Sequence, residues 1–260
     1  MSESHRSSTQ ILNRRTLEHD HRVLGEMLRP GMSVLDCGCG TGAITIGIAR
    51  AVGTTGRVVG LDRDEMLIEQ ARSELSRKNL QFVAGDISLW QSVEQFDIVT
   101  AARTLQWIAR PEDALRHMAA VCRRGGWLVV LDYSHRRNGC EPEPPQEFMR
   151  VYDAFLRWRE ANGWDNEMAD HLPDLFEEIG LEEIRAIDQD EISIRGEPDF
   201  AIRSRLWVDS LDNLAEPLAA SRFCEETELR QAQRVYAEWV ETTLERQILA
   251  LKAVVGRVPG

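Results

Sequence analysis

The chain has 260 residues, of which 43% are hydrophobic and 28% are charged, and its formal net charge is −12. This composition is typical of a globular protein with one large domain, and the acidic balance argues against general nucleic-acid binding, which depends on clustered Lys and Arg. No apolar run approaches the roughly 18 residues that a transmembrane helix needs, and the polar N-terminus lacks the apolar core of a signal peptide. We therefore expect a cytoplasmic protein without membrane partners.

The first third of the chain predicts a helix, a strand and a glycine-rich loop. We expect residues 1–8 to be a disordered leader and residues 9–28 to form one helix, because their apolar positions recur at near-helical spacing. Pro30 and Gly31 end this N-terminal helical cap of residues 1–30. A strand at 33–37 then leads into Gly38, Gly40 and Gly42, and a helix continues to about residue 52.

Short apolar strands alternate with helices over residues 31–135, the predicted ligand-binding core. After 33–37 we expect strands at 57–62, 80–84, 96–100 and 127–131, with helices near 64–78 and 112–122. Such a βαβ series favours a mostly parallel sheet covered on both faces.

Beyond residue 135 the pattern changes. A proline-rich loop at 139–145 precedes helices near 146–162 and 168–179, and we interpret residues 136–180 as a helical substrate lid. Residues 181–260 are expected to complete the sheet and the lid, with strands at 181–195 and 247–255 and helices near 198–218 and 225–245. The predicted fold class is α/β, a Rossmann-like, seven-stranded, mostly parallel sheet with a lid inserted after its fifth strand.

The cysteines give no sign of a metal site. The chain has five of them, and Cys37 and Cys39 lack the Cys-x-x-Cys spacing of metal knuckles. We expect reduced thiols and no metal.

Polar and small residues follow the strands at the edge where ligands bind in such sheets. The glycine loop does not match a dinucleotide fingerprint, G-x-G-x-x-G, and it lacks the lysine of a P-loop. Three carboxylates, Asp36, Asp62 and Asp86, surround it and would repel a pyrophosphate. They suit a phosphate-free ligand with a positive group, and Asp62 is placed to accept both ribose hydroxyls.

Five motifs in order over residues 30–135 resemble those of the class I S-adenosylmethionine-dependent methyltransferases. They are Val34–Gly42, Val58–Asp62 with Met66 and Leu67, Phe82–Ile87, Phe96–Ile108 and Gly125–Leu131. The sequence is most similar to the group that includes ubiquinone/menaquinone-biosynthesis C-methyltransferases and many small-molecule methyltransferases.

The resemblance implies S-adenosyl-L-methionine as the cofactor and assigns its contacts by position. Asp36 and the loop would hold the amino-acid part, Asp62 the ribose, and Asp86 and the Ile87 N–H the adenine. The implied cofactor-binding residues are Asp36, Gly38, Cys39, Gly40, Asp62, Arg63, Met66, Gly85, Asp86, Ile87, Ala101 and Ala102.

The candidate catalytic residues lie just after the fourth and fifth strands. Arg103 would bind a substrate carboxylate or stabilise an enolate, His135 would act as a general base, and Tyr133 would face the pocket. A surface or ion-paired role remains open for each of them. Trp107 is interpreted as a core residue. The aromatic residues of the lid favour a flat or apolar acceptor.

The expected function is methyl transfer to an O, N or C atom of a small organic molecule, for example in secondary metabolism or quinone-like chemistry. Three alternatives remain open: a protein or nucleic-acid methyltransferase, a cofactor-binding enzyme that transfers no methyl group, and a dinucleotide-dependent oxidoreductase. The net charge opposes nucleic acid, as does Thr100–Arg103 in place of an Asn/Asp-Pro-Pro-Tyr/Phe motif. The sequence does not fix the oligomeric state, and a homodimer is one option.

Overall fold

The structure is a computed structural model that describes residues 9–260, so the predicted leader at residues 1–8 lies outside the described residues. The helices are α1 (Thr9–Asn13), α2 (Leu17–Asp20), α3 (Arg22–Met27), α4 (Ala43–Ala51), α5 (Glu65–Glu74), α6 (Pro111–Val121), α7 (Gln146–Ala161), α8 (Met168–Glu178), α9 (Phe200–Arg203), α10 (Leu206–Ala220) and α11 (Glu226–Thr242), with short 3-10 turns at Leu105–Trp107 and His135–Arg137. The strands are β1 (Ser33–Cys37), β2 (Arg57–Asp62), β3 (Leu80–Ala84), β4 (Phe96–Ala102), β5 (Cys122–Tyr133), β6 (Gly139–Glu141), β7 (Glu182–Asp188), β8 (Glu191–Ile194), β9 (Arg246–Leu249) and β10 (Leu251–Arg257).

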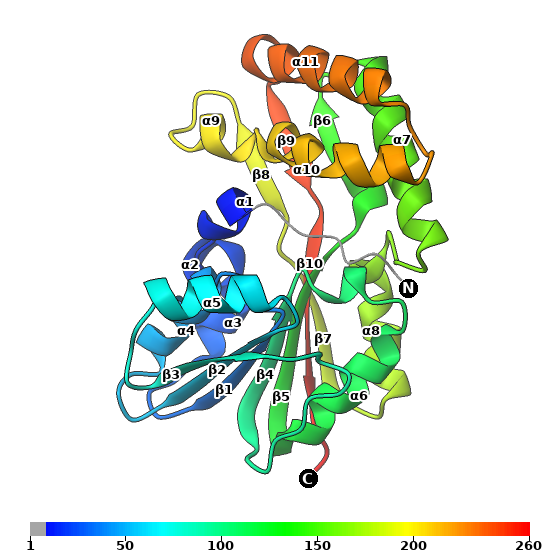
Figure 1. Cartoon of the computed structure of the whole chain (residues 1–260). Helices are drawn as coiled ribbons and strands as arrows, with labels where there is room; N and C mark the ends of the chain where they lie inside the picture. Colours follow the sequence, from blue (N-terminus) through cyan, green and yellow to red (C-terminus); the bar gives the residue numbers. More distant parts are fainter. Residues whose placement is uncertain (1–8) are drawn as a thin grey trace.

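Seven strands form the main sheet in the order β3-β2-β1-β4-β5-β10-β7 (Figure 1). The pairs from β3 to β5 are all parallel, whereas β10 runs antiparallel to both β5 and β7. The order reverses at β1 and β4, the topological switch point where such sheets bind ligands. The predicted seven-stranded, mostly parallel α/β sheet is confirmed.

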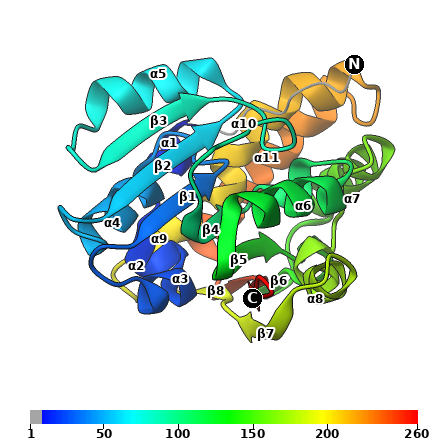
Figure 2. The same ribbon diagram turned by 90° about the horizontal axis from the view of Figure 1, so that it is seen from below.

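Successive residues of each central strand face opposite sides of the sheet and enter different hydrophobic cores. Val34, Val58, Ile98 and Val129 pack with the residues of α2, α3 and α4. Their neighbours Leu35, Val59, Val99 and Leu128 pack with α6 and α8. Figure 2 shows these two groups of helices on opposite sides of the strands.

The N-terminal segment is not one helix, so that prediction is wrong. It forms the short helices α1, α2 and α3. Thr16 has an extended backbone, and its hydroxyl accepts a hydrogen bond from the His19 N–H. The Asp20 carboxylate accepts from the Thr16 N–H at 2.7 Å. Such side-chain capping competes with helix continuation, which apolar spacing alone does not reveal.

The two long strands predicted near the C-terminus are each divided between two sheets. β7 and β10 belong to the main sheet, whereas β8 and β9 pair antiparallel in a small sheet with the order β6-β9-β8. At the break, Asn138 Oδ1 accepts from the Ala250 N–H (2.8 Å), and Asp190 Oδ1 accepts from the Leu251 N–H (2.9 Å). Side chains therefore replace strand pairing there, and the chain crosses from one sheet to the other.

Helices α7, α10 and α11 pack on one another next to the small sheet, in the upper half of Figure 1. The rings of Phe148 in α7 and Tyr236 in α11 stack with centroids 3.8 Å apart. Helix α8 instead packs against β5, β7 and β10 of the main sheet. The lid role of residues 136–180 stays a prediction. Among residues 9–260, none of the helices combines the length and apolarity needed to cross a membrane.

Candidate active site

A cavity of about 600 Å³ opens at the carboxyl ends of β1, β2, β3 and β4. Its volume lies in the range typical of small-molecule and cofactor sites. Most of the residues predicted to bind the cofactor converge here from four separate strands. Those that line it are Gly38, Gly40, Asp62, Arg63, Met66, Gly85, Asp86, Ile87 and Ala102.

The glycine loop after β1 has a backbone that other residues adopt only with strain. Gly38, Gly40 and Gly42 have φ angles of 73°, 55° and 79°. A Cβ on Gly38 would lie 2.2 Å from Thr104 Oγ1, and one on Gly42 would lie 2.5 Å from the Phe82 ring. Glycine is therefore required both for the turn and for the close approach of β4 and β3 residues.

Asp62, at the end of β2, is held by the backbone around it. Its Oδ2 accepts from the Gly40 N–H at 2.8 Å, and its Oδ1 accepts from the Asp64 N–H at 2.9 Å. Burial raises the pKa of Asp62, and these two hydrogen bonds oppose that effect. Each carboxylate oxygen has a second lone pair, so the fixed side chain can accept further hydrogen bonds from a ligand in the cavity.

Three of the predicted cofactor residues do not line the cavity. They are Asp36, Cys39 and Ala101. Asp36 is 3% exposed and lies beneath the loop, where its Oδ2 accepts from the Thr45 hydroxyl at 2.7 Å. Burial, with a smaller contribution from the charge of Asp62, raises the pKa of Asp36 to about 7 despite that hydrogen bond.

Asp86 lies at the opposite wall of the cavity and is exposed. Its Oδ1 accepts from the Ser88 N–H at 2.7 Å, which fixes the turn after β3. Met66, on the first turn of α5, lines the same cavity and is 61% exposed. A ligand bound here would cover this exposed thioether.

Arg103 follows β4 and lies at the junction between this cavity and a smaller one. It is 5% exposed and has a positive φ of 58°. Its guanidinium forms an ion pair with Glu191 of β8 and donates to the Asp20 carbonyl (3.0 Å) and the Tyr133 hydroxyl (3.1 Å). Burial acts to lower the pKa of Arg103, but Glu191, Tyr133 and Asp20 together more than offset it and raise the pKa above the usual value.

A cavity of about 80 Å³ adjoins the large one and is rich in aromatic residues. It is lined by both remaining catalytic candidates, Tyr133 and His135, together with Trp107, Phe155 and Trp207. Trp107 is half-buried and packs against the core as expected, and it also lines both cavities. It lies in the 3-10 turn that follows β4.

The hydrogen bonds of His135 define its tautomer. Gln106 Nε2 donates to the Arg103 carbonyl at 3.3 Å, so Gln106 Oε1 faces His135 Nε2 at 2.7 Å. Because an amide oxygen can only accept, His135 carries its proton on Nε2. Burial and the charge of Arg159 lower the pKa of His135 well below its usual value, and the imidazole is neutral.

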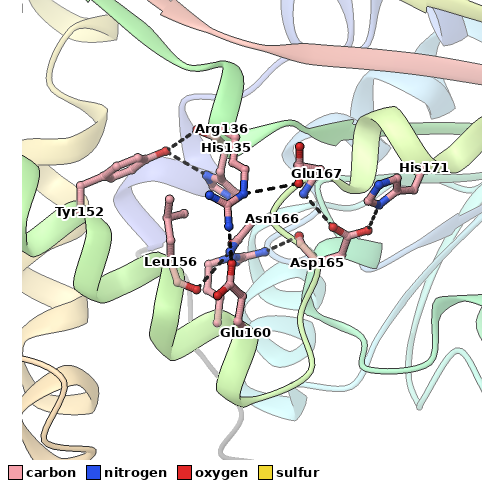
Figure 3. Close-up of polar contacts among 10 residues, drawn as sticks. His135, Arg136, Tyr152, Leu156, Glu160, Asp165, Asn166, Glu167 and His171 are labelled. Carbon is pink, nitrogen blue, oxygen red and sulfur yellow. Dashed lines mark hydrogen bonds and ion pairs between the residues drawn. The ribbon is translucent and has the colours of Figure 1, made fainter.

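A polar cluster around Arg159 contacts Gln106 and Trp107, two residues that line this second cavity. The Arg159 guanidinium donates to Asn166 Oδ1 (2.8 Å) and the Gln106 carbonyl (2.9 Å), and it lies 4.3 Å from the Trp107 ring centre. Figure 3 shows the surrounding contacts, including Asn166 with the Leu156 carbonyl and Asp165 with His171. Burial lowers the pKa of Arg159 to about 10, so the side chain remains a cation.

Leu12 and Arg15 line the large cavity although they are not among the predicted site residues, whereas Trp164 belongs to the aromatic residues of the predicted lid and lines this cavity too. Leu12 and Arg15 come from the N-terminal segment, and Trp164 follows α7. Nothing in the local pattern singles out Arg15, since an arginine beside another arginine on a polar segment usually indicates a solvated face. Its position becomes evident only when the N-terminal segment is placed over the sheet.

Comparison with known proteins identifies the same class of protein, the methyltransferases, as the sequence motifs indicate. A methyltransferase-domain family model matches residues 28–169, more than half of the chain. The chain is 40% identical over 133 residues to a ubiquinone/menaquinone biosynthesis C-methyltransferase of Ectopseudomonas mendocina, with 49% of each protein covered. It is 38% identical over 140 residues to a demethylmenaquinone methyltransferase of Staphylococcus aureus, with 53% of this chain and 55% of the relative covered. The chain thus spans about half the length of the curated relatives it matches.

Solved structures show the same fold over nearly the whole chain. The Haemonchus contortus phosphoethanolamine N-methyltransferase 2 matches with a TM-score of 0.60 at 12% identity, covering 94% of this chain and 53% of that one. The [4+2]-cyclase SpnF matches with a TM-score of 0.56 at 18% identity, covering 95% and 84%. At such identities the likeness concerns the fold alone. The family match, the motif order and the sheet order agree, and the chain belongs to the methyltransferase-domain family.

Proposed function

We propose that this protein transfers a methyl group from S-adenosylmethionine to a small organic acceptor. The observation that carries the proposal is the arrangement of Asp62 against the glycine loop, with its carboxylate fixed by the N–H groups of Gly40 and Asp64 at the mouth of the large cavity. Family membership supports the same reading.

The residues of the large cavity fit this cofactor. Asp62 offers acceptors for the ribose hydroxyls, and Gly38 and Gly40 line the cavity with backbone that carries no side chain. Asp86 and the Ile87 backbone lie across the cavity for the adenine ring. The similar Haemonchus contortus enzyme was solved with S-adenosylhomocysteine. When bound, the cofactor supplies an electrophilic methyl group on a sulfonium.

Asp36 would act from beneath the loop rather than by direct contact with the cofactor. Its hydrogen bond with Thr45 joins the end of β1 to α4, the two elements that flank the glycines. Cys39 and Ala101 would likewise shape the loop and the end of β4. We retain them as positioning residues of the cofactor site.

Arg103, Tyr133 and His135 would shape the acceptor site. Arg103 holds the Tyr133 hydroxyl, and burial raises the pKa of Tyr133, so the phenol keeps its proton and can donate it in a hydrogen bond. His135 stacks on Tyr133 with centroids 5.5 Å apart and fixes Gln106. We assign His135 a positioning role, since its Nε2 proton is already donated and its low pKa makes it a weak base.

The aromatic walls of the second cavity fit a flat or apolar acceptor. Trp107, Tyr133, Phe155 and Trp207 line it, and aromatic rings bind such groups by stacking and by apolar burial. The curated relatives act in quinone biosynthesis, which agrees with an aromatic acceptor. Methylation at carbon, oxygen or nitrogen fits the site equally well.

The test is a calorimetric titration of the protein with S-adenosylmethionine, S-adenosylhomocysteine and NAD. We expect binding of the first two and an affinity loss of about tenfold or more in Asp62→Ala, because a charged acceptor is removed. Asp174→Ala serves as the control, since Asp174 is exposed on α8. Binding of NAD alone, or an unchanged affinity in Asp62→Ala, would overturn the proposal.

A further inference from the structure

Three cavities meet at Arg15. This residue lies in the turn between α1 and α2 and lines the large cavity (about 600 Å³), the aromatic cavity (about 80 Å³) and a third cavity of about 280 Å³ beside β8. Its side chain is half-buried. Arg15 is therefore a cation at the point where a methyl acceptor would enter next to the cofactor site.

Within residues 9–260, the Arg15 guanidinium makes no hydrogen bond or ion pair. The neighbouring arginines differ from it. Arg14 pairs with Asp209 of α10 at 2.7 Å, and Arg103 pairs with Glu191. Burial, and then the charge of Arg103, lower the pKa of Arg15. The free protein thus holds a partly desolvated cation close to a second cation, an arrangement that an anion would stabilise.

The acidic side chains near Arg15 already form hydrogen bonds or ion pairs with other groups. Glu191 is paired with Arg103, and the Asp20 carboxylate accepts from the Thr16 N–H. No carboxylate lines the aromatic cavity in the described part of the chain, although Arg15 and Arg103 both do. In a protein whose net charge is −12, a cavity lined by Arg15, by the Glu191-paired Arg103 and by no acid favours negative ligands over positive ones.

Most other polar groups that line the aromatic cavity are bonded within the protein, including Asn213, whose Nδ2 donates to the Asp209 carbonyl at 3.0 Å. Gln106 and His135 bond to each other, and the Ser210 hydroxyl donates to the Leu206 carbonyl at 2.7 Å. The Tyr133 hydroxyl accepts from Arg103, and its own proton has no acceptor among residues 9–260. A buried or half-buried donor without an acceptor is costly. An acceptor oxygen on the ligand would therefore satisfy the donor groups of both Arg15 and Tyr133.

We propose that the methyl acceptor carries an anionic oxygen group, a carboxylate or a phosphate, that pairs with Arg15 and accepts from the Tyr133 hydroxyl. Its apolar body lies against Trp107, Phe155 and Trp207. The inference rests on the proposed function, because it places the acceptor beside the cofactor cavity. It narrows the substrate class to small anionic molecules with a flat or apolar part.

The test uses simple aromatic probes of equal size and different charge. Binding of benzoate, phenyl phosphate and uncharged benzamide is measured by calorimetry, with and without saturating S-adenosylhomocysteine. We expect one of the anions to bind about 10- to 100-fold more tightly than benzamide, the usual worth of a charge-assisted hydrogen bond. Whichever of benzoate and phenyl phosphate binds better identifies the anionic group.

Variants assign the preference to Arg15. Arg15→Gln should bind the anion and benzamide alike, Arg15→Lys should keep part of the preference, and Tyr133→Phe should reduce it by a smaller factor. Arg22→Gln is the charge-matched control, because Arg22 is exposed on α3. The affinity for S-adenosylhomocysteine should stay within about twofold in Tyr133→Phe and Arg22→Gln, since neither residue lines the large cavity.

Equal binding of all three probes by the unmodified protein, no binding at millimolar concentration, or an anion preference that survives in Arg15→Gln would overturn the inference. Failure of S-adenosylhomocysteine to bind would instead overturn the proposed function. The probe series without S-adenosylhomocysteine would then still decide whether Arg15 recognises an anion.

Discussion

The Thr45 hydroxyl donates a hydrogen bond of 2.7 Å to the buried Asp36 carboxylate, and this contact joins β1 to α4 beneath the glycine loop. The loop between these residues turns back so that the Gly38 and Cys39 N–H groups donate to the Leu61 carbonyl at 2.7 and 3.0 Å. The glycine loop that lines the large cavity is therefore held from below by one side-chain pair and from the side by β2.

The raised pKa of Asp36 predicts a pH-dependent stability. Its folded-state pKa of about 7 lies above the ordinary value of 3.8, so the folded protein binds this proton more tightly than the unfolded chain does. The stabilisation of the fold by this bound proton is complete below the pKa of Asp36 in the unfolded chain, and it is lost as the pH rises toward 7. Relative to Asp36→Asn, the free energy of unfolding of the unmodified protein should fall by about 1.4 kcal/mol per pH unit between about pH 5 and pH 7.

Urea unfolding of both proteins across this pH range measures the difference. Asparagine keeps an oxygen that can accept from Thr45, so the comparison isolates the proton. Above about pH 7 the difference should become constant. A difference that is flat from pH 5 to pH 8 would mean that Asp36 is already ionised at pH 5.

Replacing Gly38 by alanine should impair both stability and cofactor binding. The added Cβ would meet Thr104 Oγ1 at 2.2 Å, and the φ of 73° is unfavourable for any side chain. The left-handed backbone costs about 1 kcal/mol and the overpacking about 1–3 kcal/mol more. Thermal unfolding, with and without S-adenosylhomocysteine, measures the loss.

Gly53→Ala separates these two contributions. Gly53 has a similar φ of 68°, but a Cβ there would meet nothing within 4 Å. It should cost only the backbone part, about 1 kcal/mol. Adding Thr104→Ala to Gly38→Ala should recover part of the remaining loss. If both glycine variants lose the same stability, the contact with Thr104 is not what requires glycine at position 38.

The features that were predictable from the sequence are those encoded within a few residues of one another. Gly38, Gly40 and Asp62 sit at strand ends whose position follows from short apolar runs, and all three line the cavity as expected. Their spacing in the sequence is enough to predict the turn, the end of the strand and the position of the carboxylate. The same holds for the central strands, because each buries two faces and is apolar almost throughout.

Residues whose role depends on distant partners were not predictable. Arg15 lines the aromatic cavity together with Arg103 and Tyr133, which lie far away in the sequence. Trp107 faces the cavities because Arg159, 52 positions later, holds the turn before it. The break at Ala250 depends on Asn138 and Asp190, and no local pattern at residues 247–255 reveals it.

Arg159 should be among the most sensitive positions outside the cofactor site. It is fully buried, and its replacement by methionine would leave Asn166 Oδ1 and the Gln106 and Asp165 carbonyls without this donor. We expect Arg159→Met to lose about 3–5 kcal/mol of unfolding free energy. Arg157→Met, on the exposed face of the same helix, should change it by less than about 0.5 kcal/mol. Equal losses in these two variants, measured by urea unfolding, would show that the cluster contributes nothing beyond helix packing.

His135 should remain neutral over the whole range in which the protein is folded. Burial and Arg159 lower its pKa well below the usual value, whereas a hydrogen bond with Asp165 raises the pKa of His171. Nitrogen-15 NMR of the imidazoles between pH 8 and pH 5 should show one titrating signal for His171. It should show an unchanged neutral ring protonated on Nε2 for His135. Protonation of His135 near pH 6 would restore its candidacy as a general base.

The crossing of β7–β8 and β9–β10 from one sheet to the other joins the acceptor side of the protein to its cofactor side. Glu191 opens β8 only three residues after β7 ends, and it reaches Arg103 at the end of β4. The acceptor region is thus not a detachable module: grafting it onto a related core would require the break at Ala250 and the Arg103–Glu191 pair to be transferred in register. New acceptor specificities are more accessible through substitutions on α1 and α10, which close the cavities without contributing a strand to either sheet.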